Sequence, residues 1–461
     1  MERILELNDR LRGVLWGTPM LVLLLGTGLY FTLATGIFQV RYSTLWLRKT
    51  LFSCLKGGAE RTSGGVSPFA AMCTALAATV GTGNIAGVAT ALTLGGPGAI
   101  FWMWVSAFVG MMTAFAENTL GMLYRERGSD GTWHGGPMLY LANGLHSRVL
   151  ARAFALFCVA ASFGIGNMSQ CNSIAQGISG AFGIPKALIG GVTAVVLGAV
   201  LLGGLQRLSR VTAALVPFMA LFYLGGAAAV LWVHRERLPQ AATLILSAAF
   251  DRNAGAGGVL GYGMMQAVRT GVSRGVFSNE AGLGSSVMVH TAADAKEPCE
   301  QGMWAVFEVF FDTIVMCSIT AFVILTSGVY DPVRYALAAG TPLLAQLATG
   351  AQLTAEAFST VFGRLGGGFV AVSLALFAFS TLLGWSYYGQ RAAAYCMGEG
   401  RIPLYRALFV LAAFAGCMMR LEPVWALSDT CNGLMALPNL TGILALRGQV
   451  LTEWCRYRRN L

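Results

Sequence analysis

The stretch AATVGTGNIAGVA, residues 77–89, carries closely spaced glycines of the kind that bind anions. Gly81, Gly83 and Ala86 fit the G-x-G-x-x-G/A pattern of a dinucleotide-binding turn, in which a helix N-terminus receives a pyrophosphate. That turn needs a preceding strand and an acidic residue about 20 positions further on. The residues before Gly81 do not read as a strand, and the next acidic residue is Glu117. We therefore expect these glycines to serve a different purpose.

A second glycine cluster, SNEAGLGSS at residues 278–286, has the same character. Both clusters lie inside long apolar segments, where an interrupted helix exposes backbone N–H and C=O groups. Such groups cannot be left without partners in lipid, so both interruptions are expected to face a cavity or a ligand. Acidic residues follow each cluster in an apolar setting: Glu117 after the first, and Glu308 and Asp312 after the second. A pair of interrupted helices at corresponding places in two halves indicates a secondary transporter with an inverted repeat.

The composition is that of a membrane protein. The 461 residues are 56% hydrophobic and 11% charged, with a mean hydropathy of +0.64, whereas soluble domains carry roughly 25% charged residues. Several charge-free runs are long enough to span a bilayer as helices, which takes about 20 residues. These runs lie at 14–40, 62–116, 153–185, 187–206, 211–234 and 365–390. They do not alternate apolar and polar residues, as the strands of a membrane barrel would.

The fold class predicted from these runs is an all-α polytopic membrane protein with two broken helices. Eleven transmembrane helices are expected, at 14–36, 68–94, 98–124, 150–180, 187–205, 211–234, 262–291, 302–328, 367–395, 403–420 and 424–446. The first helix stays outside a five-plus-five repeat, and the odd number five inverts the second half relative to the first.

The predicted domain organisation follows this helix count. An N-terminal extra helix occupies 1–40, a linker 41–67, the first repeat 68–234, an extracytoplasmic loop 235–261, the second repeat 262–446 and a cytoplasmic tail 447–461. Two further segments, 131–148 and 342–368, are predicted to be surface helices that do not cross the membrane. The second is either a gate over a central site or a packed loop helix without functional motion.

The net charge of +10 comes from Lys and Arg residues concentrated in alternate loops, the first of which is 41–61. The positive-inside rule then places the N-terminus outside and the C-terminus in the cytoplasm. The basic residues are dispersed over many short loops rather than gathered on one face, so no nucleic-acid partner is expected.

The cysteines and histidines do not indicate a metal site or an enzyme. The ten cysteines form no C-x-x-C pair, and the four histidines show no ligand spacing. Because no cluster of catalytic side chains and no cofactor motif is present, neither a membrane enzyme nor a cofactor is expected. A channel is also disfavoured, since a channel has no need of two broken helices that close on one site.

Five motifs in this order resemble the alanine/glycine:cation symporters, the sodium:alanine/glycine symporter family of amino-acid carrier proteins found in bacteria and archaea. The resemblance covers residues 14–446, nearly the whole chain. Its motifs are SPFAAMCTALAATVGTGNIAGVATALTLGGPGAIFWMW, GGPMLYLANGL, GIGNMSQCNSIA, GVFSNEAGLGSS and NGLMALPNLTGILAL. It implies a fold similar to the LeuT fold, with a small neutral amino acid and sodium bound near the midplane of the bilayer.

The resemblance also implies which residues bind. Backbone N–H groups of Thr82 and Gly83 would face the substrate carboxylate, which agrees with the partial positive charge at a helix N-terminus. Sodium would be held by oxygen atoms, as a hard cation requires: the carbonyls of Ala77 and Val80 and the hydroxyls of Ser380 and Thr381. Further substrate-lining residues would be Gln170, Ser278, Asn279, Gly282, Thr381 and Trp385.

Two of these positions have a plainer interpretation. Gln170 is either a substrate ligand or part of an interhelical hydrogen bond, and Trp385 is either the wall that limits side-chain size or a packing aromatic. Asn84 is a candidate for holding the ends of the first broken helix together.

Four acidic residues inside spans, Glu117, Glu280, Glu308 and Asp312, are costly in a membrane and usually functional. They bind a second cation or form a structural network with Arg269 and Arg274, and the network is the expectation favoured here.

The predicted function is therefore import of alanine or glycine coupled to sodium by alternating access, across a bacterial inner membrane. A proton-coupled amino-acid symporter of the same fold, in which Glu280 or another acid titrates, is the alternative. The expected partners are a small neutral amino acid, sodium ion and the lipid bilayer, and no obligate protein partner is evident.

Overall fold

The computed structural model describes residues 8, 10, 11, 13, 15–55, 66–128, 131–250, 263–338, 341–419 and 422–461, the side chains of 54, 55 and 422–427 excepted. Helices dominate this part of the chain, and its one sheet consists of two antiparallel strands, β1 (Glu126–Arg127) and β2 (Trp133–His134). Six helical segments are long and apolar enough to cross a membrane, and two more qualify if each of two bent helix pairs counts as one span.

The elements follow one another in two groups, separated by residues 251–262. The first contains α2 (Thr18–Ala34), α3 (Phe38–Arg41), α4 (Ser43–Lys49), α5 (Leu51–Leu55), α6 (Pro68–Thr79), η1 (Gly83–Gly87), α7 (Val88–Gly95), α8 (Gly98–Leu123), β1, β2, α9 (Pro137–Leu139), η2 (Tyr140–Gly144), α10 (Arg148–Phe163), η3 (Gly164–Met168), α11 (Ser169–Phe182), α12 (Lys186–Leu201), α13 (Gly204–Val233), η4 (Arg235–Arg237) and α14 (Leu238–Ala249). The second contains α15 (Met264–Asn279), α16 (Val287–His290), α17 (Pro298–Val309), η6 (Phe310–Cys317), α18 (Ser318–Ser327), α19 (Pro332–Ala338), η7 (Pro342–Gln346), α20 (Gly350–Phe362), α21 (Leu365–Met397), η8 (Glu399–Arg401), α22 (Ile402–Met418), α23 (Glu422–Ala445) and α24 (Arg447–Arg459).

The predicted all-α membrane fold is confirmed, and most predicted helices agree with the observed ones to within a few residues. The expected helix 98–124 is α8, 150–180 is the continuous segment α10–η3–α11, and 302–328 is α17–η6–α18. The count of eleven stays a prediction. Residues 14, 420 and 262, at the ends of three predicted helices, lie outside the described residues, as does 251–261 of the predicted loop.

Both predicted helix breaks are present. Helix α6 ends at Thr79, and the helix that resumes at Gly83 is tilted from it by 51°. Helix α15 ends at Asn279, and residues 280–286 then lead through an irregular stretch to α16. Within this stretch Gly282 (φ 90°) and Gly284 (φ 76°) have the left-handed conformation that glycine adopts without steric cost.

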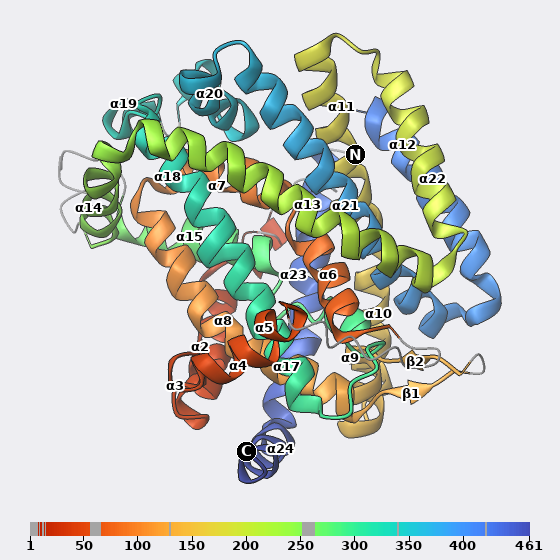
Figure 1. Cartoon of the computed structure of the whole chain (residues 1–461). Coiled ribbons are helices and arrows are strands. Elements are labelled where there is room, and N and C mark those ends of the chain that lie inside the picture. Colours follow the sequence, from red (N-terminus) through yellow and green to blue (C-terminus); the bar gives the residue numbers. More distant parts are fainter. Residues whose placement is uncertain are drawn as a thin grey trace.

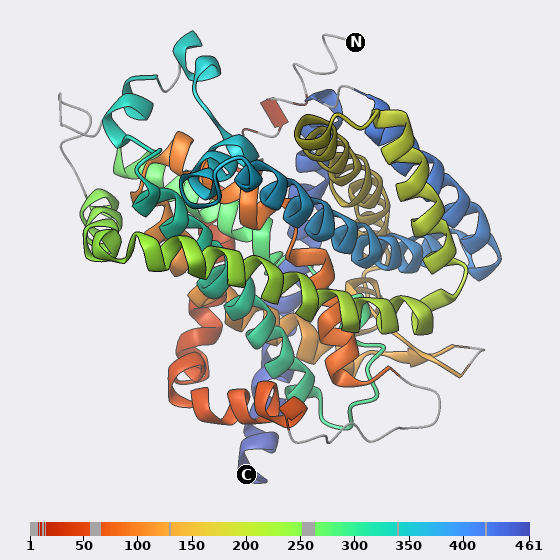
Figure 2. The ribbon, with the colours of Figure 1, turned by 45° about the horizontal axis from the view of Figure 1, so that its top comes forward.

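The first broken helix lies at the centre of the bundle. Helix α6 contacts α13, α17 and α21, while α8 packs against α15 and α17 (Figure 1). Helices α11, α12 and α22 form a separate group beside α21, and α13 runs across the face of the molecule toward α14 (Figure 2). The residues of the two breaks are therefore enclosed by helices from both halves of the chain.

The prediction for residues 131–148 was wrong in its first part. Instead of one surface helix, the segment contains strand β2, the helical residues 137–144 and, at Arg148, the first residue of α10. The guanidinium groups of Arg125 and Arg127 lie over the Trp133 ring at 4.1 and 4.8 Å from its centre, which holds the small sheet in place. In the segment 342–368, α20 covers 350–362 as expected, whereas α3 to α5, α14 and α24 were not predicted.

Close approach of α21 to α6 depends on Gly384. A Cβ at this position would lie 2.5 Å from Ala78 Cβ and 2.8 Å from the Ala78 backbone nitrogen. Small residues allow such contacts between membrane helices. We expect Gly384→Ala to destabilise the protein by about 1–3 kcal/mol, because the two helices must separate. Thermal unfolding in detergent measures this, with Gly367→Ala on the same helix as the control, since nothing lies within 4 Å of a Cβ there. Equal melting temperatures of the two variants would contradict the prediction.

Candidate functional site

The two helix breaks border a small buried cavity. Its volume is about 20 Å³, which is room for about one water molecule. The lining residues come from the first break, from η3 and α11, from the end of α15 and from α21. They are Ala78, Thr79, Gly81, Thr82, Gly83, Ile165, Gln170, Phe277, Glu280, Thr381 and Trp385.

The structure brings together five of the predicted substrate-binding residues in this lining: Thr82, Gly83, Gln170, Thr381 and Trp385. The remaining three, Ser278, Asn279 and Gly282, lie in the second break but are not among the lining residues. Their polar groups are engaged elsewhere, as described below. The roles assigned to all of these residues stay predictions.

Three of the four predicted sodium ligands, Val80, Ser380 and Thr381, lie where α21 meets the first break. The fourth, Ala77, is a buried residue near the end of α6. The hydroxyl of Ser380 is 3.4 Å from the Val80 carbonyl oxygen and also donates to Phe377 O at 2.8 Å. The neighbouring Thr381 hydroxyl is so close to the backbone of the break that a Cβ on Gly81 would collide with its oxygen. Oxygen atoms of the two elements therefore gather at one place, as a hard cation requires.

Gln170 lines the cavity and carries a buried oxygen that has no partner among the described residues. Its amide nitrogen donates to the Ile165 carbonyl at 3.0 Å, within its own helical segment. Its Oε1 atom has no hydrogen-bond partner, although the residue is only 3% exposed. A buried acceptor without a partner calls for an explanation, and a polar group of a ligand supplies one. The other interpretation of Gln170 was an interhelical hydrogen bond. The bond that the side chain makes instead lies within one helical segment, α10–η3–α11.

Asp312 on η6 links the two breaks. Its Oδ1 accepts from Asn84 Nδ2 at 2.7 Å, and its Oδ2 accepts from Ser278 Oγ at 2.7 Å and from Thr313 Oγ1 at 3.0 Å. The Asn84 side chain also accepts from the Gly81 backbone N–H at 2.9 Å. Asn84 thus holds the ends of the first break, one of the interpretations of its role given above.

Glu117 on α8 and Asn439 on α23 secure the second break. Glu117 Oε1 is 3.4 Å from the Gly282 nitrogen, and its Oε2 accepts from Asn439 Nδ2 at 2.8 Å. The same amide donates to the Gly282 carbonyl at 2.9 Å, and the Tyr140 hydroxyl donates to Asn439 Oδ1. Sequence reasoning missed Asn439, although the residue lies in the motif NGLMALPNLTGILAL.

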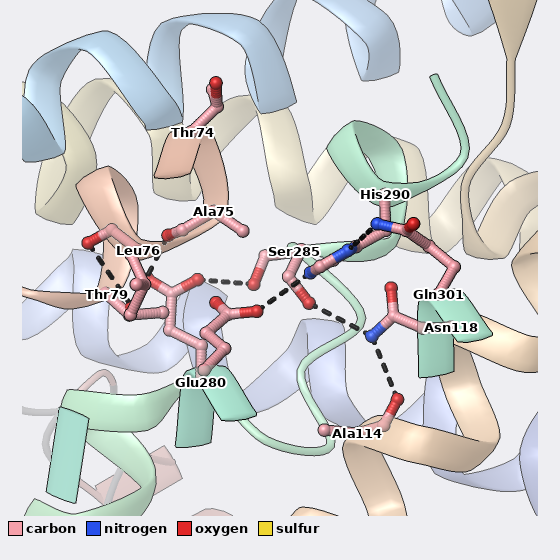
Figure 3. Close-up of polar contacts among 12 residues, drawn as sticks. Thr74, Ala75, Leu76, Thr79, Ala114, Asn118, Glu280, Ser285, His290 and Gln301 are labelled. Carbon is pink, nitrogen blue, oxygen red and sulfur yellow. Dashed lines mark hydrogen bonds and ion pairs between the residues drawn. The ribbon is translucent and has the colours of Figure 1, made fainter. Parts of the chain in front are cut away.

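Glu308 on α17 bonds to His290 on α16, with 2.9 Å between Oε2 and Nε2. Gln301 Nε2 donates to His290 Nδ1 at 2.6 Å, so the histidine N–H is directed to the carboxylate. Figure 3 shows this chain of contacts beside Thr79 of the first break and Glu280 of the second. Sequence reasoning assigned no role to either His290 or Gln301.

The predicted acidic network is thus present with different partners, and the expectation that Arg269 and Arg274 complete it was wrong. Arg269 is exposed, with its guanidinium 3.5 Å from the Thr18 hydroxyl, and the Arg274 guanidinium lies 5.7 Å from the centre of the Phe277 ring. The four acids instead bond to neutral side chains, to backbone N–H groups and to His290.

Helix α20 covers the other end of the first broken helix. Thr354 on α20 donates to the Ile85 carbonyl at 3.2 Å, and both residues are buried. This contact agrees with a gate and equally with a packed loop helix, so the choice between them stays a prediction.

Comparison with known proteins decides the family. The chain matches the model of the sodium:alanine symporter family over residues 1–461. The protein belongs to this family. It is 44% identical to the sodium/alanine symporter AgcS of Methanococcus maripaludis, over 97% of this chain and 96% of that protein. It is 36% identical to the probable sodium/glutamine symporter GlnT of Bacillus subtilis, over 100% of this chain and 92% of the relative.

Among solved structures, an outward-open Na⁺-coupled sialic acid symporter has a similar fold, with a TM-score of 0.50 and 13% identity over 87% of this chain and 82% of that one. At this identity the likeness concerns the fold alone. This member of the sodium:alanine symporter family is accordingly a multi-pass membrane transporter of the LeuT fold type, and it is not an enzyme.

Removal of the Asp312 carboxylate should destabilise the folded protein. Asp312→Ala removes the carboxylate that accepts from both Asn84 and Ser278. Asn84 keeps the Asp312 main-chain carbonyl at 3.1 Å, and both side chains keep their contacts to Cys317 Sγ, so we expect a loss of about 1–3 kcal/mol in total. We expect a lower melting temperature in detergent for Asp312→Ala and a smaller decrease for Asp312→Asn, which keeps one oxygen. Glu356→Gln, an exposed carboxylate on α20, is the control. A melting temperature of Asp312→Ala equal to that of the control would show that the link is not stabilising.

Proposed function

We propose that this transporter carries a small neutral amino acid, alanine or glycine, together with sodium by alternating access. The observation that carries the proposal is the cavity of about 20 Å³ at which both helix breaks, Gln170, Thr381 and Trp385 converge. Relatives in the family are named for alanine and for glutamine, so the family alone leaves the substrate open. A site that closes to so small a volume favours the smaller amino acids, because little displacement of its walls makes room for them.

The substrate carboxylate is assigned to the start of the helix at Gly83. Backbone N–H groups in the first turn of a helix lack partners within that helix, and the helix dipole places partial positive charge there. Thr82 and Gly83 supply these groups at the cavity wall. The unpaired Gln170 Oε1 is available to a donor of the substrate, and the Trp385 ring forms the wall that limits the side chain.

Sodium is assigned to the carbonyls of Ala77 and Val80 and the hydroxyls of Ser380 and Thr381. An ion there joins α6 to α21, so that its entry favours the closed arrangement of the two helices. Its movement down the membrane potential provides about 2.3 kcal/mol per charge per 100 mV, in addition to the concentration gradient.

The two halves 68–234 and 262–446 act in this proposal as inverted repeats around the site. Ser278, Asn279 and Gly282 position the second break and contact the substrate at most through backbone groups. The N-terminus is placed outside and the C-terminus inside a bacterial inner membrane by the distribution of basic loop residues.

Uptake into proteoliposomes tests the coupling ion. Alanine accumulation should follow an imposed inward sodium gradient and should not follow a proton gradient of equal size. Proton coupling is the second candidate, because the Glu280 carboxyl belongs to a residue of the cavity wall. If a proton gradient drives alanine accumulation in the absence of sodium, the coupling ion is the proton and the sodium proposal is wrong.

Thr381→Val tests the sodium site by deleting one oxygen and keeping the shape of the side chain. Loss of an ion–dipole contact should cost about 1.5–3 kcal/mol, the scale of hydrogen bonds to charged groups. We expect the sodium concentration for half-maximal alanine binding to rise at least about tenfold, with little change in alanine binding without sodium. Ser373→Ala is the matched control, since its hydroxyl on the same helix bonds only to Phe369 O among the described residues. An unchanged sodium titration in Thr381→Val would place the ion elsewhere.

Trp385→Ala tests the size limit. Trp385 is 1% exposed, so removal of its indole enlarges the cavity on the side of α21. The wild type should take up alanine and exclude leucine, and the variant should show a higher ratio of leucine to alanine uptake, since overpacking of a closed site is unfavourable. The ratio is the informative quantity, because the variant also loses the hydrogen bond from Trp385 Nε1 to Glu280. Leucine uptake by the wild type at the rate of alanine would refute the size argument.

A further inference from the structure

The wall of the cavity carries one carboxylate, that of Glu280. Its Oε1 accepts from Trp385 Nε1 at 2.8 Å, and its Oε2 accepts from Ser285 Oγ at 2.5 Å. Figure 3 shows the Glu280 and Ser285 side chains directed toward each other within the second break. Because Trp385 and Glu280 both line the cavity, the indole fixes the carboxylate at the cavity wall.

Among the described residues, no positively charged side chain bonds to this carboxylate. Within the part of the chain that the structure describes, the hydrogen-bond partners of Glu280 are Trp385 and Ser285, and neither Lys, Arg nor His bonds to it. Glu280 is 6% exposed. A buried carboxylate is expensive unless it is paired with a positive charge. Asp312 and Glu117 also bond only to neutral donors, but of these three acids Glu280 is the one that lines the cavity, where a positive group of a ligand can reach it.

The backbone around Glu280 favours a cation at the same place. Helix α15 ends at Asn279, so its C-terminal carbonyls place partial negative charge at this end of the cavity. Glu280 itself has a left-handed conformation, with φ 56°, that is uncommon outside glycine. Its N–H bonds to Val276 O at 2.9 Å, so the end of α15 fixes the direction in which the side chain leaves the chain.

Charges of opposite sign therefore line the cavity. The start of the helix at Gly83 contributes N–H groups and partial positive charge, while Glu280 and the end of α15 contribute negative charge. The two ends are adjacent, since a Cβ on Gly83 would lie 3.4 Å from Ser278 Cα. Gln170, another residue of the lining, has a buried side-chain oxygen without a partner among the described residues.

We propose that Glu280 binds the α-ammonium group of the substrate, with Trp385 and Ser285 as the positioning residues of its carboxylate. The proposal rests on the proposed function. It adds the protein group, Glu280, that distinguishes an amino acid from a carboxylic acid without an amino group. An amino acid satisfies both ends of the cavity at once. A carboxylic acid without an amino group leaves Glu280 buried and unpaired, and the site rejects it.

Competition for binding to the wild-type protein tests the proposal without any substitution. Labelled alanine is bound in detergent with saturating sodium, and unlabelled alanine, glycine or propionate is added. Propionate keeps the methyl group and the carboxylate of alanine and lacks only the amino group. We expect glycine to compete and propionate to fail at about 100-fold excess, which corresponds to about 2.8 kcal/mol at 1.4 kcal/mol per tenfold change. Competition by propionate within tenfold of alanine would overturn the proposal.

Glu280→Gln tests the residue itself. The amide keeps the size of the side chain and removes its charge, so we expect alanine affinity to fall at least about 30-fold, as for other buried charge pairs that lose one member. Trp385→Phe keeps an aromatic wall and removes the N–H donor, so its loss should be smaller. Glu236→Gln changes an exposed carboxylate on η4 and should bind alanine as the wild type does.

The outcomes separate this proposal from the proposed function. If the wild type shows no sodium-dependent alanine binding, the proposed function fails first. If the wild type binds alanine and a Glu280→Gln protein with wild-type melting temperature binds it equally well, only the role of Glu280 fails. A Glu280→Gln variant whose sodium titration shifts, while alanine affinity at saturating sodium is unchanged, would make Glu280 a cation ligand and would also overturn the proposal.

Discussion

The structure depends on satisfying the backbone groups that two helix breaks expose in its dry interior. Each break is secured by a carboxylate from elsewhere in the bundle and by an amide side chain, which belongs to the break itself in the first case and to α23 in the second. Asp312 and Asn84 hold the first break and connect it to Ser278 in the second, while Glu117 and Asn439 hold Gly282. The acids that looked like candidate cation ligands are in large part structural, because broken helices in lipid require such partners.

This arrangement also explains which polar groups are left for a ligand. The two carboxylates that secure the breaks bond to neutral donors, and so does that of Glu280. Glu280 differs from them in its place, because it lines the cavity together with Gln170, whose Oε1 is unpaired among the described residues. Polar groups that hold the breaks and polar groups that line the cavity are thus close neighbours in the sequence. Asn279 and Glu280 are consecutive, yet Asn279 bonds to Thr313 within the protein and Glu280 belongs to the cavity wall.

The sequence predicted the breaks and the convergence on the cavity better than it predicted the partners. Adjacent glycines inside apolar runs have few uses in a membrane, so 80–84 and 278–286 were informative by themselves. The pairing of Glu117 with Asn439 joins residues 322 positions apart, and only tertiary packing determines it. The prediction that Arg269 and Arg274 pair with the buried acids failed, because opposite charge alone does not indicate on which face of α15 a side chain lies. The sheet at 126–134 escaped prediction because it depends on an arginine–tryptophan contact rather than on periodicity.

Helix α21 connects the two proposed binding events. Thr381 and Trp385 are four residues apart and so lie on the same face of this helix, one turn from each other. Thr381 lies against the first break and Trp385 bonds to Glu280 of the second, while Gly384 brings the same helix against α6. An ion at Thr381 and an ammonium group at Glu280 would therefore both fix the position of α21 relative to the two breaks. Each ligand would then reduce the cost of ordering that the other must meet. Because linkage is reciprocal, sodium would strengthen substrate binding by the same factor by which substrate strengthens sodium binding.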